Sequence, residues 1–428
     1  KQIKKDITFI CGDKVEYQCC LPVAKEAEKR GYKITFTDNV FQKCEIGFYC
    51  QHVNFPKNSK LSCVMLHDLG QQHGEWPNMW KNEFWNHFDY GFLPNKEWVD
   101  MWQKASCYNF VKPKKGCYFA GWPKADDIHA RFFDNECEKI ISEYGIDRNK
   151  KSVLYAPSWE FNNRQLEVIE ACAELNVNLI IKQAPWNPDY NEIYKSQYLI
   201  CKDLAEKCRN IDNVFVLDPN INIFNAIHIS DLLVSEESST LYEAMMLDKP
   251  VIAVTDWLIP DIINTPPRFP DFPYDFAIHI KKEQLSTTIK EVISNEEYKE
   301  KIKQYRIENF PNIGTSAKTI MDVIDENFEN TENKVEKLTE QDNIKIPKEF
   351  RISVRKRKRL MIVCQIKKQI VDSIGAVDFK DIDSELKYSL LLSKIGFKCT
   401  YNPNIQTYVN SEEYIFKRPR LSNRLKLF

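Results

Sequence analysis

Short hydrophobic runs alternate with longer amphipathic stretches along most of the first 330 residues. In the first part of the chain, the runs that predict strands are Ile7 to Cys11, Lys33 to Thr37, Ile46 to Cys50 and Leu61 to Leu66. Between the first two, Tyr17 to Arg30 has the apolar spacing of a helix. Strands that alternate with helices predict a mostly parallel sheet with helices covering its faces.

A second cycle of the same kind begins at Ser152. Its expected strands are Val153 to Pro157, Asn178 to Ile181, Val214 to Leu217, Leu232 to Val234 and a last one from Val251, with helices around Arg164 to Leu175, Ile193 to Cys208 and Ile223 to Ile229. Gly145 to Lys151 is a polar stretch after an expected helix at Asp134 to Tyr144, which puts a boundary near residue 150. Two doubly wound sheets imply a cleft at the carboxyl ends of their strands.

The fold class is therefore α/β, with two Rossmann-like domains at residues 1–150 and 151–325 and an appendage at 326–428. The chain of 428 residues, 43% hydrophobic and 28% charged, is long enough for two cores. The sequence contains no run of about 18 to 20 apolar residues of the kind that spans a bilayer. Because the start leads directly into a strand, no signal peptide is expected, and the predicted location is the cytoplasm.

The net charge of −1 conceals an asymmetric distribution. From Lys345 to Phe428 there are 19 Lys and Arg against 8 Asp and Glu, including the run Arg355 to Arg359. Anionic lipid headgroups attract such segments, so peripheral contact with the inner membrane face is one prediction. A solvated helix face or a docking segment for another protein fits equally well. Nucleic acid is not expected as a partner, because the body is acidic and has no RNA-binding signature.

The 14 cysteines are scattered without any CxxC pair. This spacing indicates neither a zinc site nor a secreted disulfide framework. The pair Asp381 and Asp383 has the spacing of a metal-binding motif but lies in a charged tail segment, which favours a surface position. No cofactor and no metal are expected.

The segment Ser230 to Val254 has the layout of a phosphate site. An apolar strand leads into a polar turn, which opens a helix carrying Glu243. Unpaired N–H groups at a helix start attract phosphate, and Ser238 and Ser239 would add hydroxyls. Glu243, one turn later, would accept hydrogen bonds from ribose. The alternative is that the serines only cap the helix.

These residues resemble the CDP-glycerol glycerophosphotransferase family of teichoic acid and capsule polymerases. The matches to its patterns are Tyr155, Ala156, Pro157, Trp159, Ser230, Asp231, Ser238 and Ser239, with Ser158 for a threonine, Glu236 for an aspartate and Glu243 as the later acid. Glu160 stands where the family has arginine. The resemblance implies the two-domain GT-B architecture, a donor nucleotide lined by Ser158 and Trp159, and Glu236 in the donor site.

One departure concerns the donor phosphates. Where the family has Lys-x-His-Pro, this chain has Lys182, Gln183, Ala184 and Pro185, so the histidine that would meet phosphate is absent. Lys182 at its strand end is expected to supply the charge, although a solvated lysine is the alternative. Lys124, after the last strand of the first domain, is a second candidate for contact with phosphate, and a structural role is the alternative.

The segment Met65 to Trp102 holds five of the nine tryptophans. Aromatic faces stack on sugar rings, so Trp76, Trp80 and Trp85 are expected to contact a glycan or lipid-linked acceptor. Packing into a core is the alternative for two or three of the five.

Transfer to a hydroxyl needs a base, and histidine suits that role near neutral pH. His67 follows an apolar strand with Asp68 beside it, and His73 precedes Gly74. The resemblance implies a base histidine followed by glycine after a strand of this domain. His67 matches by position and His73 by dipeptide, and His67 is preferred.

The reaction expected from these residues moves a polyol phosphate from a CDP-activated donor to a hydroxyl of a cell-surface glycan or lipid-linked acceptor. A glycosyltransferase that uses a nucleotide sugar is the main alternative. A non-hydrolysing UDP-GlcNAc 2-epimerase shares the architecture and would need no acceptor. A non-catalytic lectin-like scaffold would bind glycan without binding nucleotide.

Overall fold

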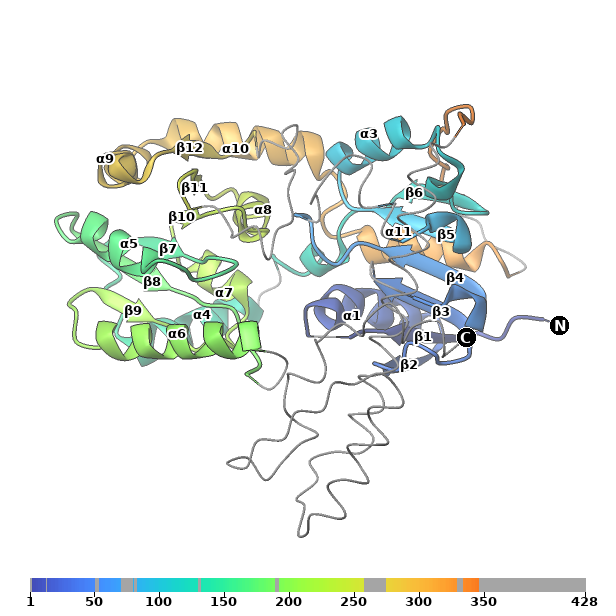
Figure 1. Ribbon diagram of the computed structural model, residues 1–428, viewed down its shortest axis with the longest axis horizontal. Coiled ribbons are helices and arrows are strands. Elements are labelled where there is room, and N and C mark those ends of the chain that lie inside the picture. The colour runs from blue at the N-terminus through green and yellow to red at the C-terminus, as the bar shows by residue number, and fades with distance from the viewer. Residues whose placement is uncertain are drawn as a thin grey trace, which may run out of the picture. The chain divides into compact units, whose positions relative to one another are not determined.

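A computed structural model of the chain describes residues 2–12, 14–50, 54–70, 80, 83–129, 132–188, 192–257, 275–328 and 334–345. The basic tail therefore lies outside the described residues. By its contacts the chain divides into two units, one of Lys1–Ala184 with Asp203–Val354 and the other of Pro185–Lys202 with Arg355–Phe428. The strands of both sheets, labelled in Figure 1, and the residues of the candidate site belong to the first unit.

The first sheet is parallel and six-stranded, in the order β2-β1-β3-β4-β5-β6. Its strands are β1 (Asp6–Ile10), β2 (Lys33–Thr37), β3 (Cys44–Cys50), β4 (Ser59–Met65), β5 (Tyr90–Leu93) and β6 (Gly116–Phe119). Its helices are α1 (Lys14–Lys29) and α3 (Lys96–Ala105), with short 3-10 turns η1 (Pro56–Asn58), η2 (Trp85–His87), η3 (Asn109–Val111) and η4 (Pro123–Ala125). The almost continuous burial of β3 and β4 is what a sheet covered on both faces requires.

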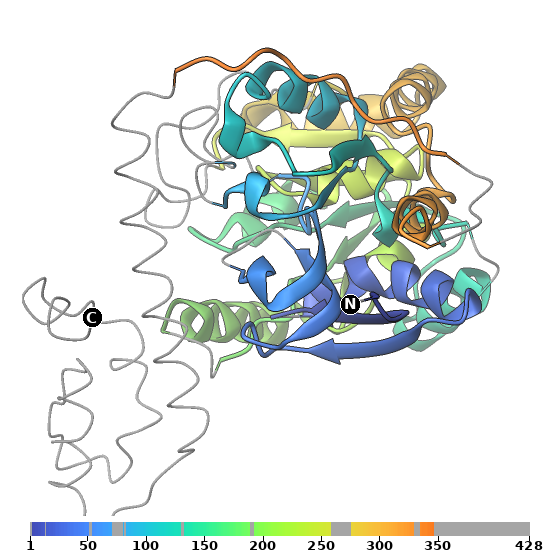
Figure 2. The ribbon, with the colours of Figure 1, turned by 90° about the vertical axis from the view of Figure 1, so that its right-hand side faces the viewer.

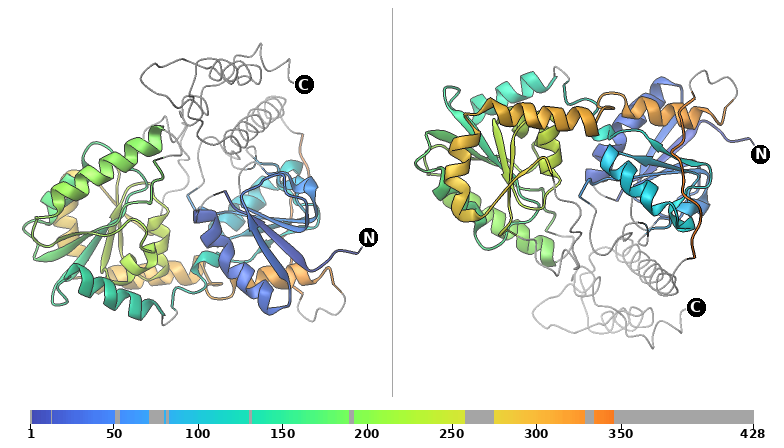
Figure 3. Two further views of the ribbon diagram at one scale, coloured as in Figure 1. Left: turned by 90° about the horizontal axis from the view of Figure 1, so that it is seen from below. Right: turned by 90° about the horizontal axis from the view of Figure 1, so that it is seen from above.

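The second sheet is also parallel, in the order β12-β11-β10-β7-β8-β9. Its strands are β7 (Lys151–Tyr155), β8 (Val177–Ile181), β9 (Val214–Val216), β10 (Leu232–Ser235), β11 (Val251–Val254) and β12 (Ile278–Ile280). The helices are α4 (Phe132–Tyr144), α5 (Arg164–Cys172), α6 (Glu192–Cys208), α7 (Ile223–His228), α8 (Thr240–Met246), η5 (Lys282–Gln284), α9 (Leu285–Val292) and α10 (Glu296–Asn309). Figure 3 shows helices on both faces of this sheet.

These two parallel sheets confirm the α/β fold class. In the first sheet, β1 lies between β2 and β3, so the chain changes direction across the sheet there. In the second sheet, β7 lies between β8 and β10 in the same way. Ligands of open α/β sheets bind outside the carboxyl ends of the strands at such switch points. The topology therefore directs attention to the turns after β1, β3, β7 and β10.

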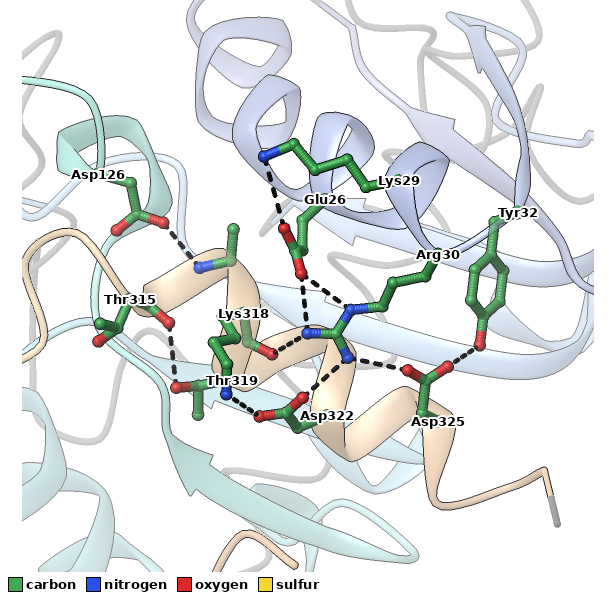
Figure 4. A network of polar contacts seen from close by, with 11 residues as sticks. Glu26, Lys29, Arg30, Tyr32, Asp126, Thr315, Lys318, Thr319, Asp322 and Asp325 are labelled. Atoms are coloured by element: carbon green, nitrogen blue, oxygen red, sulfur yellow. Dashed lines mark hydrogen bonds and ion pairs between the residues drawn. The ribbon is translucent and has the colours of Figure 1, made fainter. Parts of the chain in front are cut away.

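The last helix of the described residues, α11 (Ser316–Asp325), packs against α1 of the first sheet, and the sequence-based division assigns it to residues 151–325. Figure 4 shows how Arg30, the residue that follows α1, holds it. The guanidinium lies 2.8 Å from carboxylate oxygens of both Asp322 and Asp325, and its Nε donates to Glu26 at 2.9 Å. The Tyr32 hydroxyl donates to Asp325 as well. The chain therefore returns to its first domain after completing the second.

Replacing Arg30 with methionine is expected to lower the free energy of unfolding by about 2 to 3 kcal/mol, because the largely buried Asp325 would lose its counter-charge and Asp322 would keep only the exposed Lys318. The Arg30 side chain is 20% exposed, and those of Asp322 and Asp325 are 10% and 17% exposed. Urea unfolding followed by circular dichroism measures the loss. The matched control is Arg148→Met, whose partner Glu138 is exposed, and its loss should be much smaller. Equal losses for both variants would contradict this role of Arg30.

Residues 334–345, which fall in the polar linker expected from sequence, form an extended strap along the first domain. The Leu338 N–H donates to the Cys117 carbonyl, and the Ile344 N–H donates to the Cys107 carbonyl, both at 2.9 Å. Gly116, with φ 149°, has no Cβ, and its place is taken by the Lys337 side chain. Figure 2 shows this extended orange segment passing the teal elements around α3. Backbone pairing with β6 is what orders a segment so rich in charge.

Among the residues described, no helix is both long and apolar enough to cross a membrane.

Candidate functional site

Three side-chain contacts join the carboxyl-end turns of the two sheets. The Lys124 ammonium of η4 forms a direct ion pair with the Glu243 carboxylate of α8. Glu97 of α3 accepts a hydrogen bond from the Tyr242 hydroxyl at 3.1 Å. Lys14, the first residue of α1, donates to Asn220 at 3.5 Å. Segments that follow β1, β5 and β6 of the first sheet therefore contact segments that follow β9 and β10 of the second.

The Lys124 and Glu243 pair is almost completely buried, with side chains 11% and 3% exposed. The Lys124 ammonium also lies 5.3 Å from the ring centre of Trp122 and 5.9 Å from that of Phe224. Burial alone would lower the pKa of Lys124, but the Glu243 carboxylate, together with Cys19 and Asp68, outweighs burial and the pKa is raised. Lys124 is therefore held as a cation inside the protein.

Lys182 is the second buried lysine of this region. Its Nζ donates to the carbonyls of Gln183 and Pro219, each at 2.8 Å. Burial lowers the pKa of Lys182 to about 8; Glu243 opposes that shift, while Lys124 and Lys14 add to it. Lys124 and Lys14 therefore act on the charge of Lys182, and the Glu243 carboxylate acts on both Lys124 and Lys182. The excess of positive charge suits a ligand with at least two negative charges.

Glu236, which follows β10, binds the backbone of the turn that follows β7. One carboxylate oxygen accepts from the N–H groups of Ser158 at 2.7 Å and Trp159 at 3.2 Å, and the other accepts from the Ser235 hydroxyl at 2.7 Å. Glu236 is 2% exposed, and burial raises its pKa. It thus sets the backbone of Ser158 and Trp159. The Trp159 ring stacks on Phe161, with centroids 6.4 Å apart.

Ser238 and Ser239 precede α8, as the sequence pattern predicts for the start of that helix. The Ser238 Oγ accepts from the Thr240 N–H at 3.2 Å, and the Thr240 hydroxyl donates to the Ala156 carbonyl at 2.8 Å. Ser239 is the residue before the helix, and its side chain makes no capping hydrogen bond. The turn before α8 is thereby tied to the turn after β7.

Glu160, which replaces the family's arginine, is fully buried in a polar niche at the ends of β7 and β8. It accepts from the Tyr155 hydroxyl and from Gln183 Nε2, both at 3.0 Å, and from the Gln165 N–H at 3.3 Å. Burial raises the pKa of Glu160 to about 7. The change from arginine to glutamate is thus accommodated by hydrogen-bond donors around the carboxyl group. Gln183, in the altered Lys-x-His-Pro segment, is one of them.

His67 lies two residues after β4, and its ring faces Glu16 of α1. Nδ1 lies 4.0 Å from Glu16 Oε1, with side chains 11% and 5% exposed. Asp68, the partner expected from sequence, instead accepts from the Gly70 N–H at 2.8 Å within its own turn. Sequence reasoning missed Glu16, although a glutamate in the first turn of a helix that follows β1 is a recognisable signal. His73 lies outside the described residues.

Trp80 and Trp85 are core residues, which corrects the expectation that they form an acceptor surface. They are 1% and 0% exposed, and the Trp80 ring packs edge-on against Trp85 at 6.2 Å and Trp98 at 6.0 Å. The reason is that the tryptophan-rich segment contains β5 and α3, which bury it. Trp76 lies outside the described residues.

The exposed aromatic surface near Glu16 comes instead from Tyr17 and Phe36, whose ring centres lie 4.7 Å apart. They line an open hollow of about 260 Å³ at the ends of β1 and β2, together with Cys11, Gly12, Thr37 and Asp38. The Gly12 N–H donates to Glu16, so this hollow adjoins the His67 region.

Comparison with known proteins finds a family match inside the region that carries the site. Residues 61–259 match the sequence profile of CDP-Glycerol:Poly(glycerophosphate) glycerophosphotransferase. The teichoic acid poly(glycerol phosphate) polymerase of Bacillus spizizenii is 26% identical over 207 residues, which are 47% of this chain and 49% of that protein. The polymerase of the same name from Bacillus subtilis strain 168 is 25% identical over 50% of this chain and 28% of its own length. The chain thus spans about half the length of the first relative and a smaller share of the second.

Solved structures share the fold at low sequence identity. The wall teichoic acid polymerase TagF aligns with a TM-score of 0.51 and 16% identity over 76% of this chain and 90% of its own. A complex of S. aureus MnaA with UDP aligns with a TM-score of 0.53 and 12% identity over 80% of this chain and 100% of its own. Likeness at this level supports a GT-B architecture.

Proposed function

Residues 61–259 carry the sequence of the CDP-glycerol:poly(glycerophosphate) glycerophosphotransferase family, and from this premise we propose that the chain transfers glycerol phosphate from CDP-glycerol to an acceptor hydroxyl. The observation that carries the proposal is the cluster formed by Lys124 and Lys182, on both of which the Glu243 carboxylate acts, with Lys14 bonded to Asn220 beside it. A nucleoside diphosphate ester has the two negative charges that such a cluster balances.

The three lysines are also proposed to supply the positive charge that the family's histidine, replaced here by Ala184, would provide. Lys182 precedes that position by two residues, and it is fixed by the Gln183 and Pro219 carbonyls. Lys14 reaches the same loop from α1 through Asn220. We assign the diphosphate to these lysines, with Ser238 and Ser239 as hydroxyl donors. Preorganised cations stabilise the charge that develops on a leaving phosphate.

In the remaining parts of the donor site, the turn set by Glu236 presents Ser158 and Trp159 to the nucleotide. Glu243 is assigned to the ribose hydroxyls. Since it is paired with Lys124 in this structure, donor binding would exchange that ion pair for two contacts, Lys124 with phosphate and Glu243 with ribose. The buried pair thus holds Lys124 as a cation until the donor arrives.

The chemical step forms one bond and breaks one. The acceptor oxygen attacks the phosphorus that bears glycerol, the bond from that phosphorus to the bridging oxygen breaks, and CMP leaves. The acceptor proton passes to His67. Catalysis of phosphoryl transfer rests mainly on positioning and charge stabilisation, which the lysine cluster and the histidine supply.

A nucleotide-sugar transferase is the second candidate, and the specific observation in its favour is Ala184 in place of the family's histidine. A donor screen by titration calorimetry separates the candidates, using CDP-glycerol, CDP-ribitol, UDP-GlcNAc and GDP-mannose. We expect binding of CDP-glycerol and much weaker binding of the two sugar nucleotides. Tighter binding of a UDP- or GDP-sugar than of either CDP-polyol would refute the glycerol phosphate proposal.

The acceptor is proposed to be a cell-envelope glycan or its lipid-linked precursor, and the basic tail is proposed to bring the enzyme to an anionic membrane surface. The tail argument rests on sequence, on the excess of basic residues from Lys345 to Phe428. Deleting residues 346–428 should weaken co-sedimentation with phosphatidylglycerol vesicles and leave binding to phosphatidylcholine vesicles unchanged. Equal sedimentation of both forms with the anionic vesicles would remove the membrane proposal.

A further inference from the structure

We propose that Glu16 is the positioning residue for His67, holding the imidazole so that its Nε2 receives the acceptor proton. The inference rests on the proposed function, because it deepens the role assigned to His67. No sequence pattern used above pointed to Glu16, and it lies 51 positions before the histidine it faces. Its carboxylate is 5% exposed and reaches 4.0 Å from His67 Nδ1.

The first turn of α1 is built to present this carboxylate. Glu16 Oε2 accepts a hydrogen bond from the Gly12 N–H at the end of β1. That bond fixes one oxygen and leaves Oε1 as the atom nearest the imidazole. Glu16 also lies in the first turn of α1, where the helix dipole favours a negative charge.

The same helix also holds the backbone of His67. Cys19, one turn after Glu16, donates its Sγ–H to the His67 carbonyl at 3.3 Å. Cys19 is fully buried, and burial raises the pKa of its thiol, so it remains a neutral donor. α1 therefore contacts both the ring and the main chain of His67. A base whose ring and backbone are both restrained loses little entropy when the acceptor arrives.

A carboxylate beside Nδ1 has two chemical effects. It favours the tautomer with the proton on Nδ1, which leaves the lone pair on Nε2 for the acceptor proton. It also stabilises the imidazolium that forms when that proton arrives. The other charged groups near this turn are Asp68, Lys124 and Glu243, which all act on the neighbouring Cys19. Of these, Lys124 and Glu243 are paired with one another, and Glu16 is a carboxylate whose Oε1 lies 4.0 Å from the imidazole Nδ1.

The test uses the full chain with Glu16→Gln, since glutamine keeps an oxygen for the Gly12 N–H but removes the charge. We expect kcat to fall about 10- to 100-fold while KM for CDP-glycerol changes less than about twofold. The acidic limb of the pH–rate profile should move to lower pH, because the carboxylate no longer favours the imidazolium. Glu16→Asp should recover part of the lost rate. The matched control is Glu28→Gln, which removes the same charge from an exposed position of α1.

A second readout does not depend on turnover. The proton titration of the His67 ring, followed by NMR and assigned with His67→Gln, should have its midpoint at lower pH in Glu16→Gln than in the wild-type chain or in Glu28→Gln. An unchanged midpoint, or an unchanged kcat with an unmoved acidic limb, overturns the inference. If the wild-type chain consumes no CDP-glycerol, the proposed function fails on its own, and the NMR midpoint still decides whether Glu16 acts on His67.

Discussion

Replacing His67 with alanine is expected to lower kcat at least about 100-fold, the usual contribution of a general base. The histidine follows β4 at the carboxyl edge of the first sheet, and Glu16 lies against its ring. Binding of CDP-glycerol should change little, because the groups assigned to the diphosphate, Lys14, Lys124 and Lys182, are untouched. Measuring kcat by CMP release and Kd by calorimetry separates the two effects.

His129→Ala is the matched control, because His129 is an exposed histidine of the same domain with no assigned role. It should retain the wild-type kcat and Kd. If His67→Ala also retains the wild-type kcat, His67 is not the base. His73, the alternative from the sequence, would then be tested by His73→Ala in the same assay. A loss of donor binding in His67→Ala would place His67 in the donor site instead.

Replacing Lys182 with methionine is expected to weaken CDP-glycerol binding about 10- to 100-fold and to remove its dependence on pH between 7 and 9. Burial lowers the pKa of Lys182 to about 8, so the amine is charged below that pH and neutral above it. An anionic ligand prefers the charged form. The affinity of the wild-type chain should therefore fall as the pH rises through 8, and that of Lys182→Met should not.

The pKa of Lys182 is lowered mainly by burial. Glu243 and Asp218 raise it, whereas Lys124 and Lys14 lower it further.

The folding stability of the chain should rise with pH over the range in which its affinity for CDP-glycerol falls. Because the unfolded lysine titrates near its ordinary value, the unfolded chain binds more protons above pH 8, and stability rises with pH from about 8 to 10. Calorimetry across this range tests both statements, and a wild-type Kd that is constant from pH 7 to 9 would contradict the role of Lys182.

The parts of the fold that follow from local pattern were predictable. Strand runs such as Ile46 to Cys50 and Leu61 to Leu66 closely match β3 and β4, because buried parallel strands read as continuous apolar runs. The helix expected at Asp134 to Tyr144 is α4. Short strands were harder: β5 has four residues inside a segment dominated by tryptophan, and the aromatic residues suggested a surface rather than a sheet.

The positions of candidate site residues at strand ends were predictable where one segment carries them, and contacts between distant segments were not. Ser158, Glu236 and Ser238 lie in turns whose order along the chain already places them at strand ends. Glu16 and Lys14, by contrast, act through partners far away in sequence, His67 and Asn220, and only the tertiary fold brings them there. The burial of individual side chains could not be predicted from the local sequence either. Trp80 and Trp85 are of a residue type common in sugar-binding surfaces, yet the packing of β5 and α3 buries them.

The measurement that tests the central claim most directly is the identity of the nucleotide released in the presence of acceptor. With CDP-glycerol labelled in its glycerol carbon and a glycerol phosphate oligomer as acceptor, we predict equal amounts of CMP released and label incorporated, with both lost in Lys124→Ala. Transfer of a sugar from a nucleotide sugar would release a nucleoside diphosphate instead. Turnover of UDP-GlcNAc or GDP-mannose to UDP or GDP, with no CMP formed from CDP-glycerol, would contradict the account.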